Sequence, residues 1–287
     1  MSKVINPNIL QCPQCKSDNL HFGDILLHCS NCNSNFFLKN NKYYFQELTK
    51  DNISDNIDKI KNKFKKYEKF YRFLIRVISP VCPTVNEKKI IDKFVKDENA
   101  IALNLGSGSY DLSKKVSNLD IFDYECVDII CDIENLPIKS NSVDFIINIA
   151  VLEHVTNPEK VVEEINRVLK VGGIVCSYIP FIQPFHASPF DFSRRTYEGM
   201  KVLFKDFDII ELKCGGGPVS GFLWVFQELL SLIFSFGIKK LHIFLSLFFM
   251  VITFPIKFLD FIFIHHPMAK NISSAFFIIA KKNNLSN

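Results

Sequence analysis

The sequence carries little net charge, and its first residues lack the apolar segment of a secretory signal. Its 34 Lys and Arg residues against 30 Asp and Glu residues give a net charge of +4. So small an excess does not by itself require a polyanionic partner. Residues 1–10 contain no apolar core segment, and in a chain without a secretory signal nine cysteines indicate a reducing compartment, where thiols bind metal or lie buried. We therefore expect a cytoplasmic protein.

Four of the cysteines form two Cys-x-x-Cys pairs: Cys12 with Cys15, and Cys29 with Cys32. Two such pairs on facing turns provide the tetrahedral four-thiolate site that suits zinc. Four free thiols or a redox pair are the alternatives, which the doubled spacing disfavours. Because so short a segment buries little apolar surface, the metal would supply the folding energy. We expect residues 1–48 to form a zinc ribbon with a closed, structural site and a hairpin that turns at Asn40-Asn41.

Residues 49–97 are predicted to form a basic amphipathic helix followed by a linker. Between residues 55 and 78, apolar residues recur at alternating steps of three and four, and lysines and arginines occupy the other faces. Such a helix either attracts anionic lipid or nucleic acid, or covers the next domain with its apolar stripe and keeps its lysines in water. The second interpretation is favoured, because runs of charge usually mean exposure.

An apolar segment, residues 101–105, leads directly into the turn Gly106-Ser107-Gly108. Glycines at such a turn let a ligand approach the backbone closely, although a single Gly-x-Gly also occurs in ordinary turns. Further segments follow in order: Asn118-Leu119-Asp120-Ile121, Cys131–Pro137, Ser142–Phe145, Val151–Val155 and Glu164–Gly173. Residues 159–170 predict an amphipathic helix that ends at a glycine cap, Gly172-Gly173.

In this order and spacing, the segments resemble the class I S-adenosylmethionine-dependent methyltransferases, specifically the methyltransferase type 11 group. The resemblance covers residues 98–215 and a last strand near 274–282. It implies an α/β fold at residues 98–287: a doubly wound, Rossmann-like sheet of seven strands alternating with helices, with ligands at the carboxyl edge. It also implies S-adenosylmethionine as the methyl donor. The chain departs from the family at Ser109-Tyr110, where a third glycine-like position is usual.

The resemblance implies which residues hold the methyl donor. An acid at the end of the second strand should accept hydrogen bonds from the ribose, and two residues compete. Asp128 has the spacing from Gly106 expected of such a fold, whereas Asp120 leaves little room for a crossover helix. However, residues 127–132 predict a third strand ending in Asp132, so we assign the ribose role to Asp120 and keep Asp128 in reserve. The predicted cofactor-binding residues are Gly106, Ser107, Gly108, Asp120, Asp132, Ile133 and Ala150.

His154 is the first candidate catalytic residue. The matching position in the family is often histidine and is credited with orienting substrate. The alternative is a capping and packing role for the helix that begins near Pro158.

Residues 180–196 form the second candidate segment and resemble a loop of a subgroup often encoded with envelope-glycan enzymes. His186 or Asp191 could deprotonate a sugar hydroxyl, and Arg194 and Arg195 could bind a phosphate or carboxylate on the acceptor. Alternatively, this loop is a structural lid whose arginines pair with carboxylates. No base is obligatory, because alignment alone can carry methyl transfer.

Ordinary members of the family lack the apolar insertion at residues 219–266. Residues 222–236 and 241–254 are almost wholly apolar, and each is shorter than the roughly 20 residues that span a bilayer. A double span would also place Lys239-Lys240 outside, against the positive-inside rule. We therefore expect two helices lying at the inner face of the membrane. The alternative is a helical pair buried in a homodimer or under a partner protein.

These features favour a methyltransferase that acts on a hydroxyl of a sugar or lipid-linked envelope glycan, in polysaccharide biosynthesis at the cytoplasmic face of the membrane. An RNA methyltransferase that binds its substrate with the ribbon and the basic helix is the alternative among enzymes. The modest charge and the apolar insertion count against a nucleic-acid partner. A non-catalytic scaffold that keeps the fold is the third hypothesis.

Overall fold

The computed structural model describes residues 5–46, 77–82, 84–187 and 189–284. The basic helix predicted for residues 55–78 therefore lies outside the described residues, apart from its last two. One mixed sheet of 11 strands runs through the molecule in the order β1-β2-β3-β4-β7-β6-β5-β8-β9-β11-β10. Its strands are β1 Leu20–Phe22, β2 Leu26–Cys29, β3 Asn35–Lys39, β4 Lys42–Tyr44, β5 Ala102–Leu105, β6 Ser117–Asp120, β7 Ile129–Ile130, β8 Val143–Ile149, β9 Leu169–Pro180, β10 Phe207–Gly216 and β11 Ala275–Lys282.

The last seven strands of that order form the predicted Rossmann-like sheet. Strands β7, β6, β5, β8 and β9 are parallel, and β11 runs antiparallel between β9 and β10. Alternate residues pack on opposite faces: Leu103 and Ile146 belong to one core cluster, Ala102 and Phe145 to the other. This confirms the predicted fold class.

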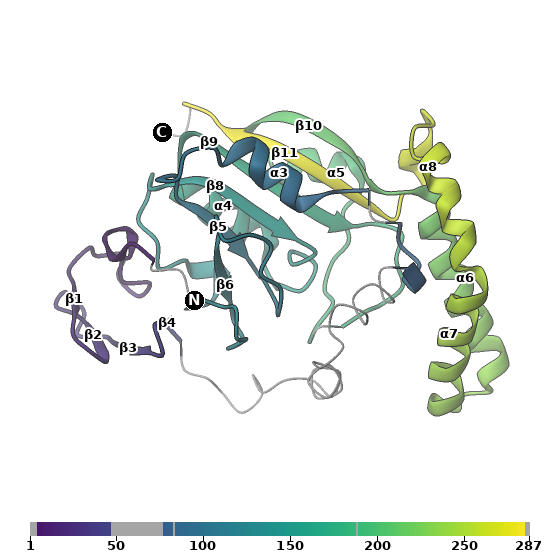
Figure 1. Cartoon of the computed structure of the whole chain (residues 1–287), viewed down its shortest axis with the longest axis horizontal. Coiled ribbons are helices and arrows are strands. Elements are labelled where there is room, and N and C mark those ends of the chain that lie inside the picture. Colours follow the sequence, from purple (N-terminus) through teal and green to yellow (C-terminus); the bar gives the residue numbers. More distant parts are fainter. Residues whose placement is uncertain (1–4, 47–76, 83, 188, 285–287) are drawn as a thin grey trace.

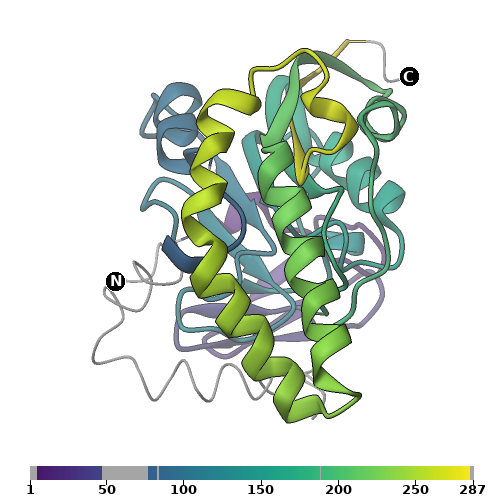
Figure 2. The same cartoon turned by 90° about the vertical axis from the view of Figure 1, so that its right-hand side faces the viewer.

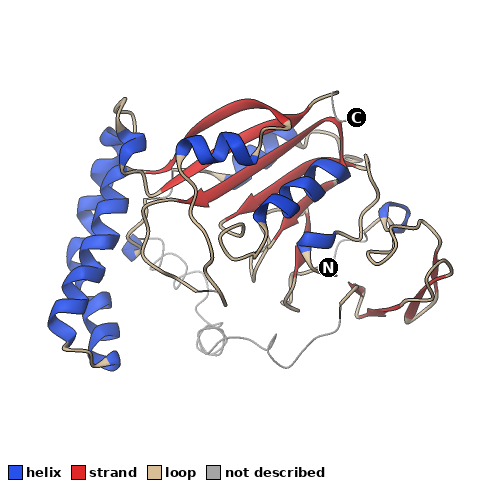
Figure 3. Ribbon diagram, turned by 180° about the vertical axis from the view of Figure 1, so that it is seen from behind, coloured by secondary structure: helices blue, strands red, loops and turns tan. Residues whose placement is uncertain are grey.

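Helices cover both faces of the sheet (Figures 1 and 3). Helix α3, Glu87–Phe94, packs on one face through Ile91. Helices α4, Pro158–Val168, and α5, Tyr197–Leu203, pack on the other. Short 3-10 turns lie at Pro7–Ile9, Ile133–Asn135 and Ala269–Asn271.

Two expected crossover helices are absent. Residues 106–116 and 121–128, all within the described part of the chain, contain no helix. The prediction of strands and helices alternating throughout is therefore wrong at these two connections. Residues 106–116 are too few for a helix with a loop at each end, since a whole parallel crossover needs a dozen or more residues.

The predicted glycine cap of α4 is also wrong. The helix ends at Val168, and Leu169 already begins β9. Gly172 has a φ of +82°, and a Cβ at Gly173 would lie 2.8 Å from the Lys170 carbonyl oxygen. The pairing with β8 shifts register between Leu169 and Ile174. These glycines therefore permit an irregularity in the strand rather than a helix end.

The ribbon, residues 5–46, continues the sheet beyond β7. Asn40 and Asn41 both have positive φ at the predicted turn between β3 and β4, as a tight hairpin requires. Strand β4 pairs in parallel with β7, and the Tyr43 and Phe45 amides donate to carbonyls of Asp128 and Ile130, at 3.0 and 2.9 Å. The ribbon thereby covers what would otherwise be an open sheet edge.

At the opposite end of the molecule, residues 218–263 form an antiparallel pair of helices, here called the apolar hairpin (Figure 2). Helix α6 spans Pro218–Ser235; α7, Lys239–Thr253, continues through a 3-10 segment, Phe254–Leu259, into α8, Asp260–Phe263. The first helix has 18 residues and, by length and composition alone, is long and apolar enough to cross a membrane, so the expectation that it is too short is wrong. The second runs for 25 residues, so the same expectation is wrong for it as well.

Polar groups hold the two helices of the apolar hairpin to each other and to the body of the protein. The fully buried Asp260 carboxylate accepts the Val219 and Ser220 amides, each at 2.8 Å, and so caps the start of α6. Gln227 donates to Thr253 between the helices at 2.6 Å. Ser220 accepts the Cys82 amide at 2.8 Å. The hairpin therefore has a polar inner side, and its position depends on directional contacts rather than on apolar packing alone.

Asp260→Ala should loosen the hairpin, because it leaves buried amides at the start of α6 without an acceptor. The expected loss in the free energy of unfolding is about 1–3 kcal/mol. The single tryptophan, Trp224, lies on α6, so its fluorescence during urea unfolding in mild detergent reports this change. The exposed Asp208→Ala on β10 is the control. An unchanged unfolding midpoint for Asp260→Ala would contradict the capping role.

Candidate functional site

A cavity of about 370 Å³ lies where β5, β6, β7 and β8 end, and we call it the strand-end cavity. Parallel strands end at one edge of the sheet, where α/β proteins bind their ligands. Six of the seven predicted cofactor residues line it: Gly106, Gly108, Asp120, Asp132, Ile133 and Ala150. Ser107 is buried in the turn between the two glycines and does not line the cavity.

The turn after β5 needs its glycines for conformation and space. Gly106 and Gly108 have φ values of +65° and +57°, in the left-handed region. A Cβ at Gly106 would lie 2.4 Å from a methyl carbon of Val151, whereas one at Gly108 meets nothing within 4 Å. Ala150, on the facing side, also has a positive φ of 54°. The backbone is therefore held in unusual conformations on two sides of the cavity.

The structure separates the two acids that compete for the ribose role. Asp120 ends β6 and lines the strand-end cavity, where its carboxylate accepts the amides of Gly108 at 2.7 Å and Phe122 at 2.9 Å. Burial raises the pKa of Asp120 despite these hydrogen bonds. Asp128 instead accepts the Asn118 amide at 2.8 Å and does not line the cavity. The geometry therefore favours Asp120.

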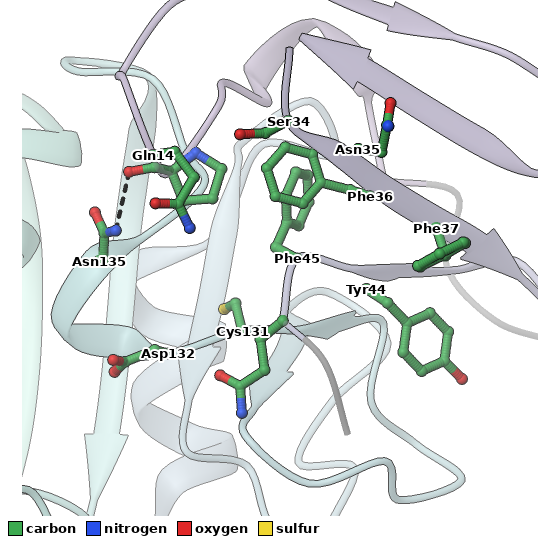
Figure 4. Close-up of a pocket in the computed structure, with 12 residues that line it drawn as sticks. Gln14, Ser34, Asn35, Phe36, Phe37, Tyr44, Phe45, Cys131, Asp132 and Asn135 are labelled. Atoms are coloured by element: carbon green, nitrogen blue, oxygen red, sulfur yellow. Dashed lines mark hydrogen bonds between the residues drawn. The ribbon is translucent and has the colours of Figure 1, made fainter. Parts of the chain in front are cut away.

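A second cavity of about 540 Å³ opens between the ribbon and the sheet (Figure 4). Cys131 and Asp132 line both cavities. Aromatic residues of the ribbon, including Phe36 and Phe45, form its other side, and Asn135 donates to the Pro13 carbonyl at 2.9 Å across the junction. The ribbon thus contributes to the surroundings of Asp132, which the sequence did not indicate.

His154 lines the strand-end cavity, and its Nδ1 lies 2.5 Å from the Phe190 carbonyl oxygen. The capping role considered for it is taken by another residue: Asn157 caps α4 by accepting the Lys160 amide at 3.1 Å. Glu153, directly before His154, is fully buried. Among the described residues, neither of its carboxylate oxygens has a hydrogen-bond partner.

His186 joins this group from the 180–196 loop. Its ring lies edge-on to that of His154, with centroids 5.5 Å apart, and stacks on Trp224 of α6 at 5.4 Å. Burial disfavours its charged form, but Glu153 and the Pro184 carbonyl outweigh this and raise the pKa of His186. Sequence reasoning missed the role of Glu153; the adjacent Glu-His pair was the available signal.

Asp191 lies in a different setting. Its carboxylate accepts the guanidinium of Arg194 and, at 2.8 Å, the His186 amide. Burial opposes ionisation, but Arg194 more than compensates and holds the pKa of Asp191 below its usual value. Arg195 pairs with Glu159 at 2.5 Å. A carboxylate this strongly engaged is a poor proton acceptor, so the geometry favours histidine over Asp191 as a base.

The four ribbon cysteines lie together at one end of the ribbon. Their Sγ atoms are all within 4.8 Å of one another, and both Cys12–Cys32 and Cys15–Cys29 are separated by 3.6 Å. A tetrahedral site with Zn–S bonds of about 2.3 Å places its sulfurs about 3.8 Å apart. The arrangement fits a closed four-thiolate zinc site, and none of the four cysteines lines the strand-end cavity.

Cys29→Ser should abolish zinc binding by the ribbon, because Cys29 supplies one of four ligands. We expect the zinc content measured by atomic absorption to fall from one ion per chain to near zero. The protein should also aggregate at lower temperature, because loss of the ribbon exposes the β7 edge. Cys214→Ser, on β10, is the matched control. Retention of zinc by Cys29→Ser would contradict the assignment.

The chain is similar in sequence to a known family. Residues 86–177 match the model of the methyltransferase domain of the type 11 group. No protein of curated function matches the chain.

Several solved structures are similar in fold. A complex of the Haloferax volcanii Trm112 methyltransferase activator with a putative methyltransferase has 14% identity over 80% of this chain and 99% of that chain, with a TM-score of 0.45. A putative sarcosine dimethylglycine methyltransferase from Galdieria sulphuraria has 16% identity over 69% and 85%, with a TM-score of 0.45. Phosphoethanolamine N-methyltransferase 2 of Haemonchus contortus, in complex with S-adenosyl-L-methionine, has 15% identity over 69% and 52%, with a TM-score of 0.42.

The matched segment contains β5 to β8, the glycine turn and most of the strand-end cavity. The chain therefore contains, at residues 86–177, a methyltransferase domain similar to the type 11 group, and is an S-adenosylmethionine-dependent methyltransferase.

Proposed function

We propose that this enzyme transfers a methyl group from S-adenosylmethionine to a hydroxyl of a sugar or lipid-linked envelope glycan, at a membrane surface. One observation carries the proposal: a continuous series of ring contacts joins the apolar hairpin to the strand-end cavity. Trp224 of the hairpin stacks on His186, and His186 contacts His154, which lines the cavity. An acceptor held at a membrane would thus meet the catalytic site directly.

The strand-end cavity suits the methyl donor. Gly106 leaves room beside Val151 that any side chain would fill. Asp120 provides a carboxylate suited to ribose hydroxyls, and Asp132 and Ile133 line the neighbouring wall. When bound, S-adenosylmethionine supplies an electrophilic methyl group on a sulfonium. We propose that these residues and Ala150 hold it.

A hydroxyl acceptor requires that a proton leave its oxygen. His154 is the candidate base that lines the strand-end cavity. In the proposed reaction the acceptor oxygen forms a bond to the methyl carbon, the carbon–sulfur bond breaks, and the sulfonium becomes a neutral thioether. The hydroxyl proton passes to His154. His186 then acts as a positioning residue, because it packs against the His154 ring.

The apolar hairpin supports a lipid bilayer as the surrounding medium. Its inner side carries the polar contacts of Asp260 and Gln227, and its outer side is apolar. Only 6% of an 18-residue apolar stretch of the second helix is buried. Among the exposed side chains are Phe222, Leu229, Leu232, Phe244, Leu247, Val251, Phe261 and Ile262. An apolar surface this continuous is rare in water and typical of membrane contact.

The test uses methyl-labelled S-adenosylmethionine in extracts of cells that express the wild type or Gly106→Arg. The arginine should block the cavity, so calorimetry with S-adenosylhomocysteine should show affinity lost by at least about tenfold relative to Val202→Ala, an exposed residue of α5. We expect wild-type-dependent label in the lipid-linked glycan fraction.

Other outcomes would overturn the proposal. Label confined to RNA would assign the enzyme to nucleic acid and give the ribbon a role in substrate binding. Wild-type protein that binds no S-adenosylhomocysteine would favour a non-catalytic scaffold.

A further inference from the structure

We propose that Glu153, His154 and His186 bind a divalent transition-metal ion beside the strand-end cavity. This site is separate from the four cysteines of the ribbon. Its catalytic use rests on the proposed function; its existence does not.

The first argument is the isolation of the Glu153 carboxylate. The side chain is fully buried, and among the described residues neither oxygen accepts a hydrogen bond. A buried carboxylate without compensation is strongly unfavourable, so a positive charge is needed close to it. The adjoining loop carries two arginines, and each is already paired with another carboxylate: Arg194 with Asp191, and Arg195 with Glu159. The negative charge of Glu153 is therefore compensated either by a proton on one of the two histidines or by a bound metal ion.

The second argument is distance. The Nε2 atoms of His154 and His186 lie 3.7 and 3.9 Å from Oε1 of Glu153. These separations are too long for hydrogen bonds. They slightly exceed the roughly 3–3.5 Å between ligand atoms that share one cation at bond lengths of about 2.1 Å. All three ligand atoms lie within 4.8 Å of one another. Side-chain movement that draws the three ligand atoms together would complete the site.

The third argument is the orientation of the histidines. Nδ1 of His154 lies 2.5 Å from the Phe190 carbonyl oxygen, and Nδ1 of His186 lies 3.1 Å from that of Pro184. Nδ1 of His186 also lies 3.2 Å from Nη2 of Arg194, which can only donate. In the tautomer in which each Nδ1–H donates to its backbone carbonyl, Nε2 keeps a lone pair on the side of Glu153. Histidines that bind metals are characteristically held in this way.

The ligand set indicates the class of metal. Two imidazoles and one carboxylate suit zinc, manganese or iron better than magnesium or calcium, which prefer oxygen ligands. Three protein ligands leave coordination positions open, as in catalytic sites. Since His154 lines the strand-end cavity, an acceptor hydroxyl could reach the ion. With the ion bound, Nε2 of His154 is a ligand and His154 no longer serves as the base. The hydroxyl would then lose its proton to water more readily, and its oxygen would form the bond to the methyl carbon as the carbon–sulfur bond breaks.

The test measures binding of Mn²⁺ and of Zn²⁺, each alone, to the full chain with its ribbon already loaded with zinc. Isothermal titration without methyl donor should show one further ion per chain. His154→Asn and His186→Asn keep a donor in place of Nδ1–H but remove the Nε2 ligand, and Glu153→Gln removes the charge. Each variant should weaken binding by at least about tenfold. His21→Gln, an exposed histidine of β1, should bind like the wild type.

Circular dichroism confirms that each variant is folded before titration. If the wild type binds neither ion, or if the Asn and Gln variants bind as tightly as it does, the site is refuted. In that case a proton on a histidine balances Glu153. The titration contains no substrate, so it tests the metal site independently of the reaction. Metal binding by an enzyme that transfers no methyl group would contradict the proposed function only. Methyl transfer by an enzyme that binds no metal would contradict this site only.

Discussion

The arrangement of the catalytic region depends on one buried charge, the carboxylate of Glu153. It lies at the exit of β8 with no hydrogen bond among the described residues, and the rings of His154 and His186 are the groups that face it. Compensating this charge brings together a strand end, the 180–196 loop and, through Trp224, the apolar hairpin. The strand-end cavity, the 180–196 loop and the apolar hairpin are thus joined through a few side chains.

At the other end of the molecule, the ribbon pairs with strand β7 and covers that edge of the methyltransferase sheet. The pairing of β4 with β7 extends the sheet, and the Lys42 ammonium pairs with Asp123 at 2.7 Å across the same junction. The ribbon therefore stabilises strand β7, whose following residues, Cys131 and Asp132, line the strand-end cavity. Zinc binding by the ribbon and methyl-donor binding in the strand-end cavity would then influence each other through the sheet, without a residue that contacts both.

Local sequence patterns predicted much of this structure. The glycine turn, the apolar strands, the asparagine turn and the paired cysteines all express short-range constraints that a few adjacent residues determine. The absent helices were harder to foresee, because the family pattern outweighed the short spacing of residues 106–116. Gly172-Gly173 resembled a helix cap. However, Leu169 pairs with Val143 of β8, so β9 already begins before the two glycines.

Long-range contacts could not be predicted from these patterns. Nothing near Glu153 indicates that His186 approaches it, since the meeting depends on how the 180–196 loop folds back. The polar inner side of the apolar hairpin depends likewise on Asp260 reaching the start of α6. Partners for Asp191 and Arg194 were foreseen only as an alternative, and the structure pairs them with each other.

The most direct test of this account is flotation of the purified enzyme with phosphatidylethanolamine–phosphatidylglycerol vesicles. The account predicts that the wild type floats and that Phe244→Gln/Leu247→Gln/Val251→Gln, on the exposed face of α7, loses at least about nine-tenths of its vesicle binding. The control Ile25→Gln/Val171→Gln/Val202→Gln removes equally exposed apolar residues elsewhere and should float like the wild type. Equal flotation of both variants, or none by the wild type, would contradict a catalytic site held against a bilayer.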